Sequence, residues 1–172
     1  MTHVLLLTGR PGVGKTTVIR KVAAGLAGRR LGGFYTEEIR VDGERRGFSL
    51  TSFDGRQGVM AHVDFRGRDR VGRYGVDVAV IDELAASALG LSRDVSVYLV
   101  DEIGKMECLS PGFVAAMRAL LDSPRLVVAT IGQRGGGFIA EVKARPDTEL
   151  WEVTLASRDG LPPRVLAWLA QR

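Results

Sequence analysis

Short, continuous apolar runs alternate with longer segments of helical periodicity along most of this chain. Runs of four to six residues are too short for helices and are typical of strands buried on both faces of a sheet. The apolar runs are Val4–Thr8, Val95–Val100, Leu126–Ile131 and Leu150–Leu155. The helical pattern covers Lys15–Gly28, Val80–Leu89, Pro111–Leu121, Phe138–Ala144 and Ser157–Gln171. The alternation predicts βαβ units and a mostly parallel sheet flanked by helices, which is an α/β fold.

The region after the first helix has a different pattern. Asp42-Gly43 and Asp54-Gly55 separate three strand-like segments, Gly33–Val41, Arg45–Phe53 and Gln57–Val63. Asp-Gly pairs readily adopt the positive φ values that tight hairpin turns require. We therefore expect an antiparallel hairpin region inserted after the first helix. A polar loop over residues 65–74 should follow it.

The length and composition fit one globular domain that spans residues 1–172. The chain has 172 residues, of which 45% are hydrophobic and 26% are charged, and these values exclude disordered and collagen-like classes. No apolar run approaches the roughly 20 residues that cross a bilayer, so we expect no membrane association. The single cysteine, Cys108, cannot form an internal disulfide, which fits a reducing compartment. We expect a cytoplasmic protein that is a monomer or only weakly associated.

The positive charge of the chain is modest. The formal net charge is +4, and a basic protein of this kind can bind nucleic acid. However, Asp69 interrupts the run of Arg66, Arg68 and Arg70, and Asp64 lies close by. A solvated, partly neutralised loop accounts for this run, so we do not expect nucleic acid as the main partner.

One motif carries the strongest chemical information. Residues 9–16, GRPGVGKT, match the pattern G-x-x-x-x-G-K-[ST] and lie between a predicted strand and a predicted helix. The glycines let successive N–H groups point at phosphate oxygens, and the positive end of the helix dipole faces the same anion. Lys15 should reach the β- and γ-phosphates, and Thr16 should ligate Mg²⁺. The nucleotide-binding residues expected here are Gly9, Arg10, Pro11, Gly12, Val13, Gly14, Lys15, Thr16 and Thr17.

A second motif follows the second apolar strand. Val97–Asp101 is an apolar run that ends in an acid, the Walker B pattern, and Glu102 comes next. Asp101 should bind Mg²⁺ through its water shell, because this ion keeps several waters and prefers one or two carboxylates. Glu102 is placed to deprotonate an attacking water, although a helix-capping or solvated acid would also suit the end of a strand.

Three separated segments resemble one family. The segments are Asp101–Glu107 (DEIGKME), Gly32–Arg40 (GGFYTEEIR) and Val71–Asp77 (VGRYGVD). They look like the small P-loop nucleoside-triphosphatase family, which has thermophilic members and a human cancer-related member. The resemblance implies a RecA-like P-loop fold and slow, Mg²⁺-dependent hydrolysis of nucleoside triphosphates with little preference among bases. It also implies that Glu102 is the catalytic base and that Ile103, Gly104, Lys105 and Glu107 belong to the site.

The transition state of phosphoryl transfer usually needs a cation beyond Lys15. Lys105 and Arg134 follow strands whose carboxyl ends should meet at one edge of the sheet, whereas Arg73 is a candidate through the family resemblance alone. We take Lys105 and Arg73 as candidate catalytic residues. The resemblance also raises Thr36 and Glu37 as residues near the nucleotide.

The sequence is also compatible with two other functions. A small-molecule or nucleotide kinase uses the same fold but must bind an acceptor and exclude water, and the glycine-rich segment Gly132–Gly137 is a candidate lid. A nucleotide-dependent switch that binds RNA or a protein is the third hypothesis. An acid placed directly beside the Walker B aspartate favours water as the nucleophile, and therefore a hydrolase.

Overall fold

The computed structural model describes all residues, 1–172, and contains one nine-stranded sheet with the strand order β5-β6-β4-β3-β2-β7-β8-β1-β9. The strands are β1 (Val4–Gly9), β2 (Leu31–Val41), β3 (Glu44–Ser52), β4 (Gln57–His62), β5 (Arg70–Val71), β6 (Tyr74–Val76), β7 (Val97–Ile103), β8 (Val127–Gly132) and β9 (Thr148–Glu152). The helices are α1 (Lys15–Gly25), α2 (Val78–Ala88), α3 (Pro111–Leu121), α4 (Gly137–Lys143) and α5 (Leu161–Ala170), with a short 3₁₀ turn at Glu107–Leu109.

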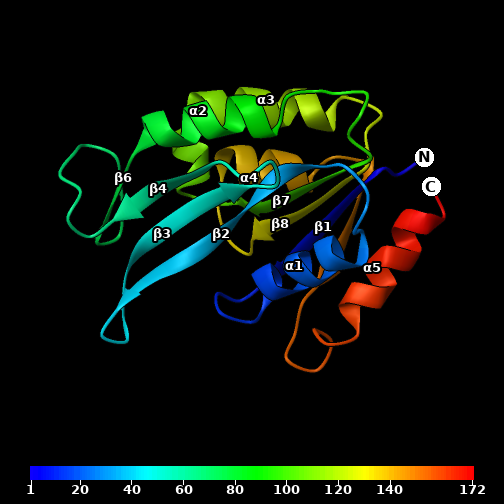
Figure 1. The fold of residues 1–172 in the computed structure, drawn as a ribbon, viewed down its shortest axis with the longest axis horizontal. Coiled ribbons are helices and arrows are strands. Elements are labelled where there is room, and N and C mark those ends of the chain that lie inside the picture. Colours follow the sequence, from blue (N-terminus) through cyan, green and yellow to red (C-terminus); the bar gives the residue numbers. More distant parts are fainter.

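The sheet has a parallel half and an antiparallel half. Strands β2, β7, β8, β1 and β9 pair in parallel, whereas β3, β4, β5 and β6 form an antiparallel extension on the far side of β2. Only Leu31–Phe34 of β2 pair with β7, so the rest of β2 continues past the parallel strands together with β3 (Figure 1). The predicted α/β sheet and the inserted antiparallel region are both confirmed.

Helices cover both faces of the sheet, and each face has its own core. Helices α2 and α3 lie on one face, and α1 and α5 lie on the other (Figure 1). The core under α2, α3 and α4 has 26 buried residues, and the core under α1 and α5 has 15. Side chains of β7 enter the two cores alternately. Tyr98 and Val100 belong to the larger core, and Val97 and Leu99 belong to the smaller one. This two-sided burial explains why its sequence is a continuous apolar run.

Several details differ from the sequence prediction. Strand β7 continues to Ile103, so Asp101 and Glu102 lie within the strand and not after it. Strand β9 ends at Glu152 and leaves Leu155 in the following loop. The predicted loop over residues 65–74 contains the short β5–β6 hairpin, which a turn with positive φ at Gly72 connects. Two-residue pairings of this kind depend on a neighbouring strand, here β4, and leave no periodic pattern in the sequence.

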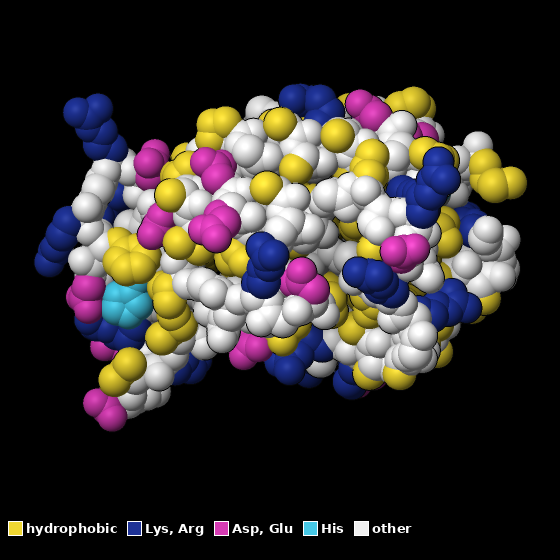
Figure 2. All heavy atoms as spheres, turned by 45° about the horizontal axis from the view of Figure 1, so that its top comes forward, with side chains coloured by type: hydrophobic (Ala, Val, Ile, Leu, Met, Phe, Trp, Pro, Cys, Tyr) yellow, Lys and Arg dark blue, Asp and Glu magenta, His cyan; other side chains and the backbone are white.

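The charged side chains do not form a single patch on the face shown in Figure 2. Lys and Arg side chains alternate there with Asp and Glu side chains and with apolar groups. Fourteen ion pairs, most of them with exposed partners, are distributed over the chain. None of the helices combines the length and the apolar character that a bilayer crossing requires.

Candidate active site

The loop between β1 and α1 has the geometry of an anion cradle. Gly12 and Gly14 adopt positive φ values of 78° and 112°, which L-residues with side chains rarely adopt. Gly14 caps α1 without a side-chain hydrogen bond, and no acidic residue occupies the first turn. The N-terminal N–H groups of α1 are therefore not neutralised by the protein, and they and the helix dipole favour an anion at this point.

Lys15 lies folded over this loop. Its Nζ donates to the carbonyl oxygen of Gly9 at 2.8 Å and lies 3.4 Å from that of Arg10. It also lies 3.8 Å from Oε2 of Glu102. The ammonium group thus has only carbonyl oxygens and one carboxylate as partners, and a phosphate would offer it a stronger one.

Asp101 is held by three threonines from three different elements. Oδ2 accepts hydrogen bonds from Thr16 Oγ1 (2.8 Å) and from both the backbone N–H (3.3 Å) and Oγ1 (3.2 Å) of Thr36, and Oδ1 accepts one from Thr130 Oγ1 (2.7 Å). The side chain is almost fully buried, with 1% of Asp101 exposed. Four donors fix the orientation of a buried carboxylate and offset its lost hydration.

An irregularity in β7 brings both acids to this edge. Val100 pairs with Ala129 of β8 and Ile103 pairs with Ile131, so Asp101 and Glu102 together oppose the single residue Thr130. The peptide bond between the two acids is cis. Such bulges redirect side chains and are frequent beside active sites. Here the bulge directs Asp101 toward Thr16 and Glu102 toward Lys15.

Glu102 and Glu107 form an acidic pair beside Lys15. Burial raises the pKa of the Glu102 carboxyl above its usual value, and Lys15 partly offsets this increase. Burial and the neighbouring Glu102 raise the pKa of the Glu107 carboxyl well above its usual value. A side chain at Gly104 would lie 2.7 Å from Oε1 of Glu102 and 2.9 Å from Oε2 of Glu107, so only glycine lets the two carboxyls approach here.

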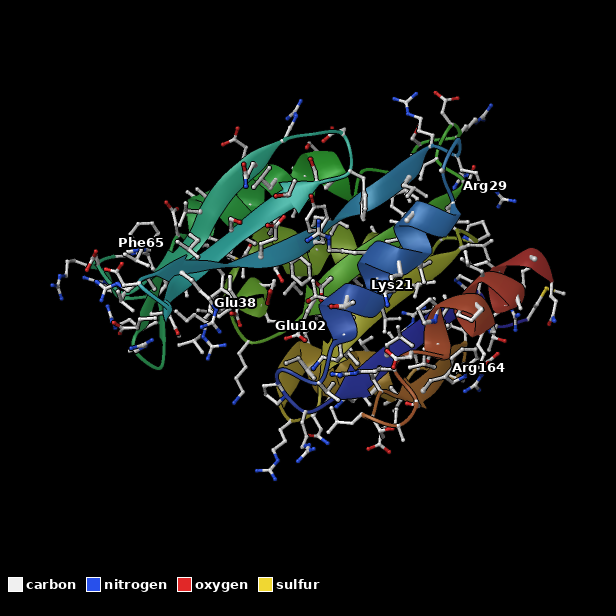
Figure 3. All side chains as sticks on the ribbon, turned by 60° about the horizontal axis from the view of Figure 1, so that its bottom comes forward. Lys21, Arg29, Glu38, Phe65, Glu102 and Arg164 are labelled. Atoms are coloured by element: carbon white, nitrogen blue, oxygen red, sulfur yellow. The ribbon has the colours of Figure 1, made fainter.

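These groups line one open cleft of about 1200 Å³. The lining includes the P-loop, Asp101, Glu102 and the segment Gly104–Glu107, and it extends to the antiparallel strands on one side and to Leu155 on the other. Figure 3 shows Glu102 at the N-terminal end of α1 and Glu38 farther out along β2. All the residues expected to bind nucleotide line the cleft except Ile103. Ile103 is fully buried in the larger core, because the bulge turns it away from the two acids.

The candidate cations are placed very differently. Lys105 and Arg134 line the cleft, are exposed and form no ion pair. Arg73 does not line the cleft; its guanidinium pairs with Glu44 at 3.2 Å and also donates to the carbonyl oxygen of Arg45. The β5–β6 hairpin places Arg73 on the outer side of the antiparallel strands, away from the cleft lining that the family segment led us to expect.

The sequence did not single out Thr130. Its hydroxyl is buried and lies one strand away from Asp101, on β8. The only available signal was a polar residue inside an otherwise apolar strand. Thr36, raised only through the family resemblance, also reaches Asp101. Glu107 proved to be more deeply buried than a site-lining acid on a loop suggests.

The donor set fits Mg²⁺ when a nucleotide supplies phosphate oxygens. Thr16 and Asp101 provide hard oxygen ligands within 2.8 Å of each other, as this ion prefers. No group of three or more His, Cys, Asp or Glu side chains is arranged to hold a metal ion by itself.

Comparisons with known proteins found relatives that match nearly the whole chain. A family model described as NTPase matches residues 4–166. "Nucleoside-triphosphatase THEP1" of Thermotoga petrophila is 40% identical over 163 residues, which cover 94% of this chain and 90% of that protein. The crystal structure of THEP1 from the hyperthermophile Aquifex aeolicus has a TM-score of 0.88 and 35% identity, and the match covers 96% of this chain and 98% of that one. The solution structure of a human cancer-related nucleoside triphosphatase has a TM-score of 0.82 and 34% identity, with 98% and 97% covered.

These matches extend over nearly the whole chain and confirm the resemblance that the three sequence segments indicated. The α/β P-loop fold expected from the glycine motif is confirmed by the same structures. The chain belongs to the NTPase family.

Proposed function

We propose that this protein is a magnesium-dependent nucleoside triphosphatase, which converts a nucleoside triphosphate and water into a nucleoside diphosphate and phosphate. One observation carries the proposal: Glu102 lies beside both the P-loop Lys15, at 3.8 Å, and the buried Asp101 in a single cleft. The activity in the names of the relatives supports the same reaction.

In the proposed reaction, the N–H groups of the P-loop and Lys15 hold the β- and γ-phosphates. When bound, Mg²⁺ neutralises charge on these phosphates, and Thr16 and Asp101 are the residues that would hold it. Glu102 accepts a proton from water as the water oxygen bonds to the γ-phosphorus. The bond from the γ-phosphorus to the bridging oxygen breaks, the diphosphate leaves with the electron pair, and Glu102 returns its proton to solvent or phosphate.

The raised pKa of Glu102 supports its role as the base. Burial makes its carboxyl a better proton acceptor than an exposed glutamate. Lys15, which opposes this increase, has phosphate as its stronger partner once nucleotide binds. Binding of the triphosphate therefore draws Lys15 away from Glu102 and leaves the base with higher proton affinity.

The proposal includes slow turnover. The two cations available for the transition state, Lys105 and Arg134, are exposed and have no ion-pair partners that hold them in place. Transition-state charge is stabilised most when the donors are positioned in advance. Cations that must be ordered during the reaction contribute less, and this supports a low catalytic rate.

The proposal also includes broad base specificity. The recognisable contacts are made to phosphates and Mg²⁺, and the chain contains no Asn-Lys-x-Asp segment that would read guanine. ATP, GTP, CTP and UTP should all be hydrolysed. A preference above about a hundredfold, or roughly 2.7 kcal/mol, for any one of them would contradict this part of the proposal.

Phosphate release from the four triphosphates tests the proposal, with and without Mg²⁺ and with and without added nucleosides or RNA. We expect Mg²⁺-dependent release that needs no acceptor. Loss of ATP without phosphate release, only when a nucleoside is present, would indicate a kinase. Strong stimulation by RNA would indicate a nucleotide-dependent switch. We further propose that the active form is a monomer, which light scattering on the purified protein can test.

A further inference from the structure

The large cleft extends beyond the residues that the proposed reaction uses. Its volume of about 1200 Å³ exceeds the roughly 300–1000 Å³ that is usual for the pocket of one small ligand. From Glu102 the cleft continues along the antiparallel strands, in the direction in which Figure 3 shows Glu38. We call this part the antiparallel arm. It is lined by Glu38, Arg45, Phe48, Met60, Val71 and Met106.

Apolar side chains from four segments form the wall of the antiparallel arm. Phe48 lies on β3, Met60 on β4 and Val71 on β5, and Met106 comes from the segment after β7. Phe48, Val71 and Met106 are half-buried and pack against the larger core. Each therefore has one side on the core and one side on the cleft. Hydrolysis needs space for one water molecule, whereas an apolar wall with a few polar groups suits an organic molecule.

The far end of the antiparallel arm offers a cation. Nη1 of Arg45 donates to Oε1 of Glu38 at 3.0 Å, and its Nε donates to the hydroxyl of Tyr74 at 3.1 Å. Arg40 pairs with Oε2 of Glu38 at 2.7 Å, so two arginines neutralise this carboxylate. Nη2 of Arg45 has no hydrogen-bond partner in the protein. A guanidinium that is held on one edge and free on another is suited to a carboxylate of a ligand.

The antiparallel arm is short. Thr36 donates to Asp101, and the alternation along β2 places the Thr36 and Glu38 side chains on one face of the sheet. Two residues along a strand are separated by roughly 7 Å, so the arm spans about the length of one ring or a short carbon chain. A molecule of this size that binds its carboxylate to Arg45 has its opposite end beside Glu102.

We infer that the antiparallel arm binds a small alcohol whose apolar body ends in a carboxylate, and that this alcohol accepts the γ-phosphoryl group in place of water. The inference rests on the proposed function, because it uses the same phosphate site and the same base. The alcohol oxygen bonds to the γ-phosphorus, and its proton passes to Glu102. The bond from the γ-phosphorus to the bridging oxygen breaks, and the nucleoside diphosphate leaves with the electron pair. The products are a phosphate monoester and the diphosphate.

Phosphorus NMR spectroscopy on the full chain with ATP and Mg²⁺ tests the inference, because it separates a phosphate monoester from inorganic phosphate. The probe is para-(hydroxymethyl)benzoate, which has an alcohol and a carboxylate on opposite sides of one ring. We expect its phosphate ester to form alongside inorganic phosphate. Para-methylbenzoate lacks the alcohol and should give no ester. Benzyl alcohol lacks the carboxylate and should give about tenfold less ester, the usual effect of losing one hydrogen bond to a charged group.

Two variants test where the alcohol binds. Arg45→Gln removes the cation and should lower the ratio of ester to phosphate by about tenfold. Val71→Phe fills the arm from a different strand and should lower this ratio as well. Arg46→Gln is the matched control, since Arg46 is next in the chain but does not line the cleft and pairs with Asp64 at 3.2 Å. Its ratio should equal that of wild type.

The inference is wrong if the wild-type protein forms no ester, or if benzyl alcohol gives as much ester as the probe. It is also wrong if both arm variants keep the wild-type ratio, or if Arg46→Gln loses as much as Arg45→Gln. Phosphate release without any alcohol, measured separately, decides the proposed function. A protein that releases phosphate but forms no ester would keep the proposed function and lose only the acceptor site.

Discussion

Two acidic regions at the carboxyl end of β7 differ in their surroundings. The first is Asp101, and the second is Glu102 together with Glu107 from the 3₁₀ turn that follows the strand. Asp101 accepts four hydrogen bonds from three threonines and is almost fully buried. Glu102 and Glu107 have no hydroxyl partners; their carboxyls approach each other beside Gly104, and Glu102 also lies 3.8 Å from Lys15. The first region holds a carboxylate in one place. The second raises carboxyl pKa values, and this difference suits the proposed roles of Asp101 at a metal and of Glu102 as proton acceptor.

The comparison also shows how one sheet edge can serve two tasks. Hydrogen-bond donors from neighbouring elements stabilise the charged form of an acid, whereas burial without donors favours its neutral form. A bulge that places Asp101 and Glu102 opposite one residue of β8 directs them to these two environments.

Glu102→Gln should lower kcat by about 10²- to 10⁴-fold, the usual contribution of a general base. Gln keeps the size and can hold the water but cannot accept its proton. Calorimetry should find nearly unchanged binding of Mg²⁺ and a non-hydrolysable triphosphate. Turnover within about threefold of wild type would mean that another group, with Glu107 and Glu38 next in line, takes the proton.

Lys105→Ala should lower kcat by about tenfold, which is less than the roughly 10²- to 10³-fold loss for a preorganised donor, because Lys105 is exposed and must be ordered during the reaction. Arg73→Ala is the matched comparison, because Arg73 pairs with Glu44 outside the cleft, and its kcat should stay within about twofold of wild type. Steady-state phosphate release measures both. Equal losses in the two variants would show that surface charge, and not position in the cleft, matters.

Thr130→Val should lower the free energy of unfolding by about 1.5–3 kcal/mol, the usual value of a hydrogen bond to a charged group. The shape is kept, but the buried Asp101 loses its 2.7 Å donor. Urea denaturation measures the change. Thr51→Val is the control, since its buried hydroxyl has no hydrogen-bond partner and its loss should be neutral or stabilising. If Thr130→Val lowered the free energy of unfolding by less than Thr51→Val, the hydrogen bond from Thr130 to Asp101 would not stabilise the fold.

Glu107→Gln should change how stability depends on pH. The folded protein holds the Glu107 proton more tightly than the unfolded chain, whose pKa is near 4.5. Above this pH the unfolded state binds fewer protons, so wild-type stability falls as the pH rises toward the folded pKa. Gln has no proton to lose. The melting temperature of the variant minus that of wild type should therefore increase between about pH 4 and about pH 8. A constant difference would mean that Glu107 is not held neutral.

Much of the site could be predicted from local sequence. The glycine loop, Lys15, Thr16 and the apolar strand that ends in Asp101 are contiguous patterns, and each needs only its own strand or helix to be recognised. The structure brings these residues to one cleft because carboxyl ends of parallel strands share an edge of the sheet. The antiparallel insertion could be predicted equally well, since its two Asp-Gly turns are local sequence signals.

Other features depended on contacts that no local pattern records. Thr130 reaches Asp101 only because β8 lies next to β7, and the order of strands is set by the packing of the whole sheet. Ile103 belongs to the core and Arg73 to an outer ion pair, although both lie in segments that resemble the family. The short pattern showed only that each residue is near the site in the sequence. The bulge decided where the Ile103 side chain points, and the β5–β6 hairpin decided where the Arg73 side chain points.

The sequence by itself determined the α/β class, the phosphate loop and the acid that follows the apolar strand, because these depend on periodicity and on residues within a few positions of each other. The tertiary structure alone decided that Asp101 accepts hydrogen bonds from three threonines and that the partly buried Glu102 has no hydroxyl donor, because hydrogen bonding and pKa depend on neighbours from distant elements. It also decided that the Val153–Gly160 loop lies beside the P-loop, since Arg158 and Val13 meet only when α5 packs on α1.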